Sequence, residues 1–165
     1  MTTITTLNLR HGGGTRTKRI LESLASLTSD ILVLTEFRNN GHGDTIKNGL
    51  VGFGYTHLYE TNADPKLNSV LIASKQAFEA KTFPELGDHS QRVLKIACHD
   101  FTLFGTYFPG KDDKKYVFEF LLKYIQEHPN EKVIITGDIN TGKHFIDEKG
   151  ATSFHPDYLD KFEPQ

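Results

Sequence analysis

The stretch Lys132–Gly142 places an acidic and an amide side chain directly after a short apolar run. It reads Lys-Val-Ile-Ile-Thr-Gly-Asp-Ile-Asn-Thr-Gly, so Asp138 and Asn140 are two residues apart. On a strand this spacing puts both side chains on one face. α/β proteins commonly build their sites where a buried strand ends in polar residues. The structural alternative is an Asx turn, in which these side chains bond their own backbone.

Other apolar runs end in the same way. The run 30–36 finishes at Glu36, and Asn8 and Tyr107 also follow apolar residues. If these strand ends meet at one edge of the core, their side chains and those of Asp138 and Asn140 form one oxygen-rich cluster. Carboxylate and carbonyl oxygens are the ligands that Mg²⁺ prefers. The sequence therefore predicts a magnesium site, and it contains no Cys/His spacing typical of zinc.

The elements that must position these residues follow from hydrophobic periodicity. Strands are expected at 4–9, 30–36, 55–60, 68–74, 76–83, 92–98, 101–107 and 132–137. Helices are expected around 20–27 and 116–125, with shorter ones at 44–50 and 157–162, and 84–90 is expected to be loop. Hairpins in the middle and crossovers near both ends predict an α/β fold of stacked mixed sheets flanked by helices.

Length and composition bound the class of protein. The 165 residues favour a single domain over 1–165, and 37% hydrophobic with 24% charged residues is typical of a globular chain. The net charge of −2 gives no overall basic field of the kind that nucleic-acid-binding proteins often carry. A phosphate substrate is still compatible with this charge, because a bound divalent cation supplies positive charge locally.

Cysteine use and the N-terminus bear on the compartment. Cys98 is the single cysteine, so an internal disulfide is excluded, and its apolar surroundings indicate packing rather than nucleophilic chemistry. The residues Met1–Thr6 lack the basic and apolar regions of a signal peptide. No run reaches membrane-spanning length, so we expect a cytoplasmic location without a membrane partner.

Four of these segments together resemble the endonuclease/exonuclease/phosphatase superfamily, the metal-dependent phosphodiesterases of deoxyribonuclease I-like fold. They occur in family order as Thr6–Arg10, Asp30–Arg38, Gly105–Pro109 and Gly137–Asn140, and the strand 68–74 is also similar. The resemblance implies a deoxyribonuclease I-like α/β sandwich. It further implies hydrolysis of a phosphodiester with Mg²⁺, or Mn²⁺ in its place, by an enzyme of nuclease type. Hydrolases of DNA, RNA, inositol phosphates and lipid headgroups share these motifs.

The resemblance also implies a role for each residue of the cluster. Glu36 would hold the metal, with Asn8 helping directly or through water. Asp138 would orient or deprotonate the attacking water, and Asn140 would bind the phosphate beside it. Tyr107 would donate to a phosphate oxygen. Such an arrangement agrees with the charge neutralisation and oriented nucleophile that metal-assisted hydrolysis needs.

Basic residues near these motifs are candidate substrate contacts. Arg92 occupies a place where relatives often carry a residue that contacts phosphate. Arg10, His11 and Arg38 are further candidates, with ordinary surface charge as the alternative. Some relatives have an acidic residue where this chain has Arg10, so a second acidic ligand is absent there.

The chain departs from the family pattern after Asn140. Family members end with a Ser-Asp-His segment whose histidine is central to phosphate hydrolysis, whereas His155-Pro156-Asp157 has these residue types in another order. We therefore expect a C-terminally incomplete family domain: a naturally short member, a fragment, or half of an assembly. An unpaired sheet edge would then invite a homo-oligomer or a completing chain.

Two other functions are compatible with the same residues. Gly137–His144 nearly spells the P-loop motif of nucleotide-binding proteins, but His144 replaces the hydroxyl that would bind Mg²⁺ and no helix is indicated after it. A non-catalytic relative that binds metal or phosphate without turnover is the second alternative. The missing histidine favours it, and the retained Glu36, Asp138 and Asn140 argue against it.

Overall fold

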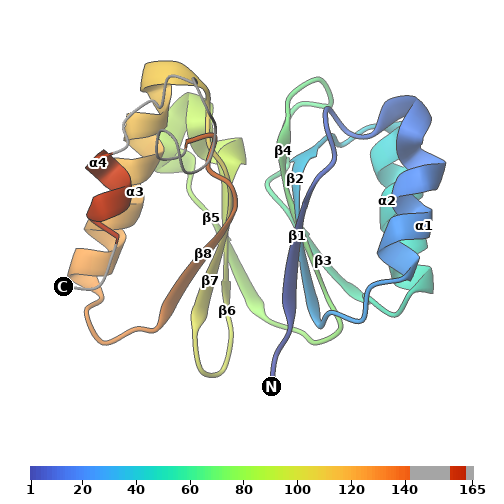
Figure 1. The fold of residues 1–165 in the computed structure, drawn as a ribbon, viewed down its shortest axis with the longest axis horizontal. Helices are drawn as coiled ribbons and strands as arrows, with labels where there is room; N and C mark the ends of the chain where they lie inside the picture. Colours follow the sequence, from blue (N-terminus) through green and yellow to red (C-terminus); the bar gives the residue numbers. More distant parts are fainter. Residues whose placement is uncertain (142–156, 163–165) are drawn as a thin grey trace.

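A computed structural model of the chain describes residues 1–141 and 157–162. Two four-stranded sheets pack face to face, with helices on the outer face of each (Figure 1). Helices α1 (Thr17–Ala25) and α2 (Gly41–Gly52) cover one sheet, and α3 (Lys114–Glu127) covers the other, with the short α4 (Asp157–Asp160) beside it. The expected α/β architecture of stacked mixed sheets flanked by helices is therefore confirmed. None of the described helices is long and apolar enough to cross a bilayer.

The two sheets have matching layouts. The first runs in the order β1 (Ile4–Asn8), β2 (Ile31–Phe37), β4 (Ser69–Ser74) and β3 (His57–Glu60). The second runs β5 (Glu79–Thr82), β6 (Val93–Ala97), β7 (Thr102–Tyr107) and β8 (Val133–Asp138). Each contains one parallel pair, β1 with β2 and β7 with β8, and the other neighbours are antiparallel. Each predicted strand corresponds to one of these.

The central strands β2 and β4 are mostly apolar because both of their faces are buried. In β2, Leu32 and Leu34 pack toward the helices, whereas Ile31 and Val33 pack into the core between the sheets. Gly105 of β7 permits the sheets to approach closely, because a Cβ there would lie 2.9 Å from Val33 Cγ1.

The topology brings the carboxyl ends of four strands to one end of the sandwich. The helical crossovers β1–α1–β2 and β7–α3–β8 keep each linked pair parallel, so β1, β2, β7 and β8 all finish at the top of Figure 1. Strand β4 runs antiparallel to β2 and therefore starts there, just after Asn68. Polar residues at these ends consequently meet, although they are far apart in the sequence.

Two segments differ from the sequence expectation. Residues 84–90, expected to be loop, belong to a 3-10 segment over Pro84–Arg92 that is interrupted at Gly87. Helix α2 is longer than the expected 44–50, because Asn40 caps it by accepting hydrogen bonds from the backbone N–H groups of His42 and Gly43. Two glycines in the first turn of α2 obscure this start in the sequence, because glycine disfavours helix.

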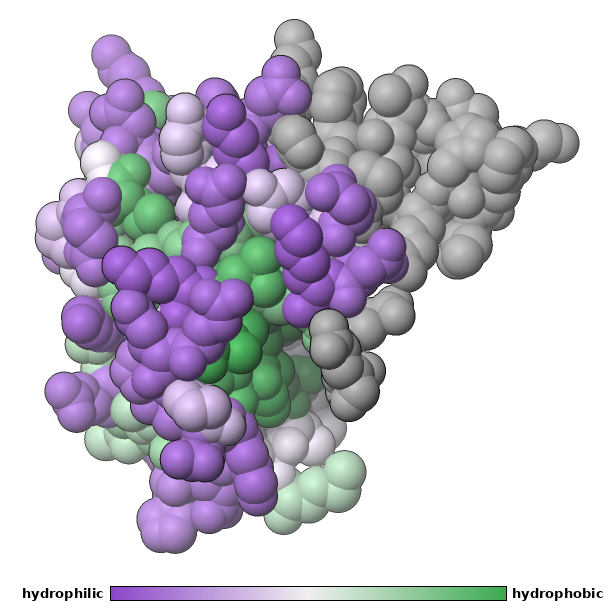
Figure 2. Space-filling model, turned by 90° about the vertical axis from the view of Figure 1, so that its left-hand side faces the viewer, coloured by the Kyte–Doolittle hydropathy of each residue, from purple (hydrophilic) through white to green (hydrophobic). Residues whose placement is uncertain are grey.

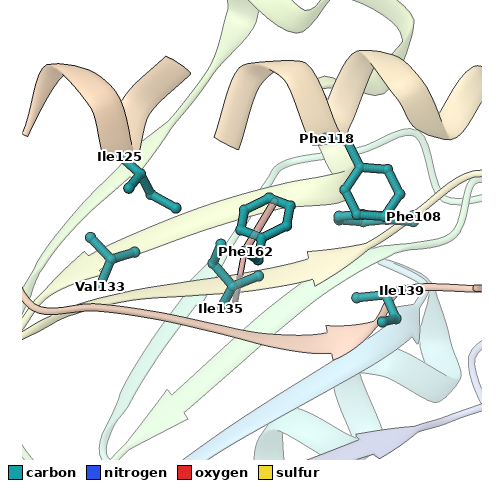
Figure 3. A pocket seen from close by; sticks show the side chains of 7 residues that line it. All are labelled: Phe108, Phe118, Ile125, Val133, Ile135, Ile139 and Phe162. Carbon is teal, nitrogen blue, oxygen red and sulfur yellow. The ribbon is translucent and has the colours of Figure 1, made fainter. Parts of the chain in front are cut away.

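An apolar hollow lies between α3 and β8. The side chains lining it are Phe108, Phe118, Ile125, Val133, Ile135, Ile139 and Phe162 (Figure 3). Figure 2 looks onto this side and shows apolar surface framed by hydrophilic residues. Phe162, which follows α4, packs against the core formed by α3 and the second sheet. The described C-terminal residues thus contribute to this core.

Candidate active site

Asn8, at the end of β1, links two carboxylates that come from different sheets. Its Nδ2 donates to Glu36 Oε1 at 2.9 Å and to Asp138 Oδ2 at 2.6 Å. Its Oδ1 accepts from the backbone N–H of Arg10 at 2.7 Å, which fixes the orientation of the amide. The structure therefore brings together three residues that the sequence analysis singled out.

Glu36 occupies an irregular point of β2. The register with β4 shifts between Thr35 and Phe37, and Glu36 itself has φ 52°. A non-glycine residue in this left-handed region is strained, and such strain concentrates at functional sites. The bulge turns the Glu36 side chain to the end of the sandwich, where it is 13% exposed. Its Oε2 accepts from the backbone N–H of His11 at 2.8 Å and from Asn68 Nδ2 at 3.0 Å.

Asn68 connects Glu36 to the basic side of the site. Its Oδ1 accepts from Arg38 Nε at 2.8 Å, and its Nδ2 lies 2.9 Å from His11 Nδ1 and 3.5 Å from the Tyr107 hydroxyl. His11 Nδ1 is also 3.2 Å from Glu36 Oε2, and a hydrogen bond between these two atoms would require a proton on Nδ1. We assign Nδ1 as an acceptor, because Asn68 can then donate to it. The sequence analysis did not identify Asn68 as a site residue. Its available signal was its place directly before an apolar run, whereas the other site residues follow such runs.

Arg92 and Tyr107 form one wall of the site. The guanidinium carbon of Arg92 lies 4.9 Å from the centroid of the Tyr107 ring. Its Nε and Nη1 are buried and have no hydrogen-bond partner among the described residues. Arg92 as a whole is only partly buried, and a guanidinium is suited to phosphate oxygens.

Asp138 and Asn140 close the cluster from the second sheet. Asn140 has φ 47°, and its backbone N–H donates to Asp138 Oδ1 at 3.0 Å, so the Asx turn considered from the sequence is present. Asp138 nevertheless reaches Asn8 through its other carboxylate oxygen. The Asn140 Nδ2 donates to the Phe108 carbonyl at 2.8 Å rather than facing the cluster.

Lys114 is a buried cation beside this loop, and the sequence analysis did not identify it. Its side chain is 1% exposed, and its Nζ donates to the backbone carbonyl of Asn140. Burial lowers the pKa of Lys114, and the nearby charge of Asp138 opposes that shift. A lysine at the first position of a helix opposes the helix dipole, and this was the available sequence signal for a role outside the helix.

The remaining candidates divide between the cluster and the surface. His11, Arg38 and Arg92 adjoin it through the contacts above. Arg10 is exposed, and its hydrogen bonds to Asn8 and Arg16 run through its backbone. Burial raises the pKa of the Cys98 thiol to about 11, so this residue has the character of a packing residue.

The donor set fits a hard cation. Within residues 1–141 and 157–162, no three His, Cys, Asp or Glu side chains are grouped so that they could hold a metal. Glu36 and Asp138 nevertheless approach the same amide from two sides. Mg²⁺ typically takes one or two carboxylates and retains several waters, whereas a zinc site needs more protein ligands. The residues present are therefore compatible with magnesium.

The fold is thus a sandwich of two sheets with an acidic and amide cluster at its strand ends. The model of the Endonuclease/Exonuclease/phosphatase family matches residues 5–160. The chain belongs to this family. No curated protein sequence gives a significant match.

Solved structures share the fold at low sequence identity. An AP endonuclease from Archaeoglobus fulgidus superposes with a TM-score of 0.75 at 21% identity, covering 98% of this chain and 68% of that one. A variant of the 3′ phosphatase NExo from Neisseria, bound to a product DNA hairpin, gives 0.65 at 21% identity and covers 86% and 58%. A humanized D. rerio TDP2 gives 0.66 at 18% identity and covers 86% and 63%. The chain thus spans between 58% and 68% of the length of these proteins.

Part of the sequence pattern cannot be compared with the structure. Residues 142–144, which complete the P-loop-like motif, and His155-Pro156 lie outside the described residues. The family match covers the stretch that contains both and supports phosphoesterase chemistry over nucleotide binding by a P-loop.

Proposed function

We propose that this chain is a metal-dependent phosphodiesterase of nuclease type that hydrolyses phosphodiesters in nucleic acid. The observation that carries the proposal is the amide of Asn8, which holds Glu36 of one sheet and Asp138 of the other within hydrogen-bond distance. Two of the similar structures are named as an endonuclease and as a phosphatase bound to DNA, which supports nucleic acid as the substrate class.

Glu36, with Asn8 directly or through water, would hold Mg²⁺, or Mn²⁺ in its place. When bound, the cation would neutralise charge on the phosphoryl oxygens. The contacts from His11, Asn68 and Asn8 hold the Glu36 carboxylate in one orientation. A preorganised carboxylate of this kind avoids reorganisation when charge develops in the transition state.

The second sheet would supply the groups around the nucleophile. Asp138, oriented by Asn8, would position or deprotonate the attacking water. Asn140 would bind a phosphate oxygen after its amide leaves the Phe108 carbonyl. Tyr107 would donate its hydroxyl to another phosphate oxygen, and Arg92, whose guanidinium lies over the Tyr107 ring, would contact the next phosphate of the strand.

Other expectations remain predictions. His11 and Arg38 would contact the substrate beyond the scissile phosphate, and Arg10 would do so only if its exposed side chain turns toward the site. Strand β8 lies at the edge of the second sheet among the described residues, so a second copy or a completing chain could pair there. A cytoplasmic location is likewise a prediction from the sequence.

A cleavage assay tests the proposal. Plasmid DNA, RNA and bis(p-nitrophenyl) phosphate are incubated with the protein in Mg²⁺ or in EDTA. We expect hydrolysis in Mg²⁺ alone, and its loss in Glu36→Gln and Asp138→Asn. Glu22→Gln, an exposed change on α1, is the matched control and should retain activity. Absence of turnover by a folded protein that binds Mg²⁺ would instead support the non-catalytic binding relative.

A further inference from the structure

A stacked pair of rings lies outside the cluster described above. His89 of the 3-10 segment packs on Tyr116 of α3, with ring centroids 5.6 Å apart and planes inclined by 21°. Tyr116 is nevertheless 49% exposed, and Lys115 Nζ lies 5.1 Å from the centre of its ring. An aromatic ring that is held by a second ring and flanked by a cation, yet open to solvent, has the properties of a stacking platform.

The platform is connected to the candidate active site through one short segment. His89 and Arg92 are three residues apart in the 3-10 segment, and this spacing puts their side chains on the same side. Arg92 lies over Tyr107, whose hydroxyl is 3.5 Å from Asn68 Nδ2. One ring contact, one helical spacing and one stacked pair therefore relate Tyr107, Arg92, His89 and Tyr116, which we call the row.

The row contains polar atoms without partners. Arg92 Nε, Arg92 Nη1 and His89 Nδ1 are buried and make no hydrogen bond within the described part of the chain. Arg92 is nevertheless only partly buried as a residue, its guanidinium suits a phosphate oxygen, and it links Tyr107 of the cluster to the segment that carries His89.

Cations and rings that occur together are the combination with which proteins bind polynucleotides. Proteins that bind single strands combine positive groups along the phosphates with rings on which successive bases stack. A base can stack on a protein ring only after it has left its own helix. An inositol phosphate or a lipid headgroup would use the guanidinium but would leave the rings without a role.

We propose that the substrate is a single-stranded polynucleotide, with the phosphate next to the scissile one on Arg92 and the following base on the Tyr116–His89 pair. The assignment to the flank of a scissile phosphate rests on the proposed function. The stacking of a base on Tyr116 does not, because it can be measured without turnover.

Fluorescence anisotropy of an end-labelled single-stranded oligonucleotide in EDTA tests the platform. Tyr116→Ala should weaken binding between about 5-fold and 150-fold, the range expected for loss of one stacked base. Tyr116→Phe keeps the ring and should bind like the unchanged protein. Phe53→Ala is the control, because Phe53 is an exposed ring at the end of α2, and it should have no effect. Tyr116 is exposed, so folding of these variants is expected to be retained.

The outcomes separate the platform from the enzymatic proposal. Equal affinities of Tyr116→Ala and Phe53→Ala would overturn the platform, and so would equal losses in Tyr116→Phe and Tyr116→Ala. A Tyr116→Ala effect of the same size on fully paired duplex would overturn the single-strand assignment. If binding depends on the ring but no substrate is hydrolysed in Mg²⁺, the proposed function fails while the platform stands. If substrate is hydrolysed but Tyr116→Ala binds the oligonucleotide as tightly as the unchanged protein, only the platform is refuted.

Discussion

Replacing Asn8 with alanine removes a neutral group that holds Glu36 and Asp138 together. Two hydrogen bonds to charged acceptors are lost, at 2.9 and 2.6 Å. Such bonds contribute about 1.5 to 3 kcal/mol each, and we take the lower end because both share one nitrogen in a partly exposed site. The expected loss is therefore about 2 to 3 kcal/mol of the free energy of unfolding.

Electrostatic repulsion adds a dependence on salt to this effect. The amide geometry places the two acceptor oxygens no more than about 5 Å apart, where two unit charges repel by about 3 kcal/mol at an effective dielectric constant of about 20. Without the amide the repulsion is no longer offset, so Asn8→Ala should be least stable at low ionic strength. Added salt should recover part of the loss by screening.

Thermal unfolding in EDTA measures the effect. For a domain of this size, about 2 to 3 kcal/mol lowers Tm by roughly 5 to 10 °C. Asn48→Ala, an exposed change within α2, is the control and should not lower Tm. Cleavage by Asn8→Ala should fall about 100-fold, because a catalytic group displaced by about 1 Å costs that much. A Tm within about 1 °C of the unchanged protein would refute the bridging role of Asn8.

Two further predictions concern the surroundings of the site, and a third concerns Asp30, before the start of β2. Gly137→Ala should lower the free energy of unfolding, measured by urea titration, by about 3 kcal/mol or more. The reason is that Gly137 has φ 138° and that a Cβ there would lie 1.9 Å from the Thr106 carbonyl oxygen. Gly110→Ala is the control and should be nearly neutral, because a Cβ at Gly110 would meet no atom within 4 Å. Lys114→Met should lower kcat about tenfold or more with little change in KM, because the donor to the Asn140 carbonyl is lost. Lys123→Met, on the exposed side of α3, is the control and should change neither kcat nor KM. Hydrogen bonds from the backbone and side chain of Thr3 hold the pKa of Asp30 below its ordinary 3.8. Asp30 therefore stabilises the fold at neutral pH, and that contribution disappears as pH falls below about 3.8. Asp30→Asn should flatten this part of the decline in urea midpoints with falling pH, and an unchanged decline would contradict the assignment.

The fold could be predicted from the sequence mainly because its central strands β2 and β4 are marked by apolar runs. Residues 31–34 face two different cores and are fully buried. A short apolar run of this kind is typical of a strand that is buried on both faces. The crossover helices were recognisable by their periodicity. The 3-10 segment Pro84–Arg92 contains no fully buried residue, so no hydrophobic pattern indicated it.

The candidate site could be predicted only in part, for a different reason. Asn8, Glu36 and Asp138 lie at or next to the ends of their strands, and that position together with the family motifs drew attention to them. Asn68 begins a strand, and only the antiparallel pairing of β4 with β2 carries it to the same end. Lys114 lies on a helix, and its contact with Asn140 depends on how α3 packs against the second sheet. Such contacts follow from the tertiary arrangement rather than from any local signal.

Each sheet contributes one of the two acids, Glu36 from β2 and Asp138 from β8. Neither half of the sandwich is therefore sufficient for the chemistry. A shift of one sheet against the other at the seam, the contact between Gly105 and Val33, would separate the Glu36 and Asp138 carboxylates while both sheets stayed intact. Loss of catalysis should consequently precede loss of secondary structure when the protein is heated or mutated along that seam.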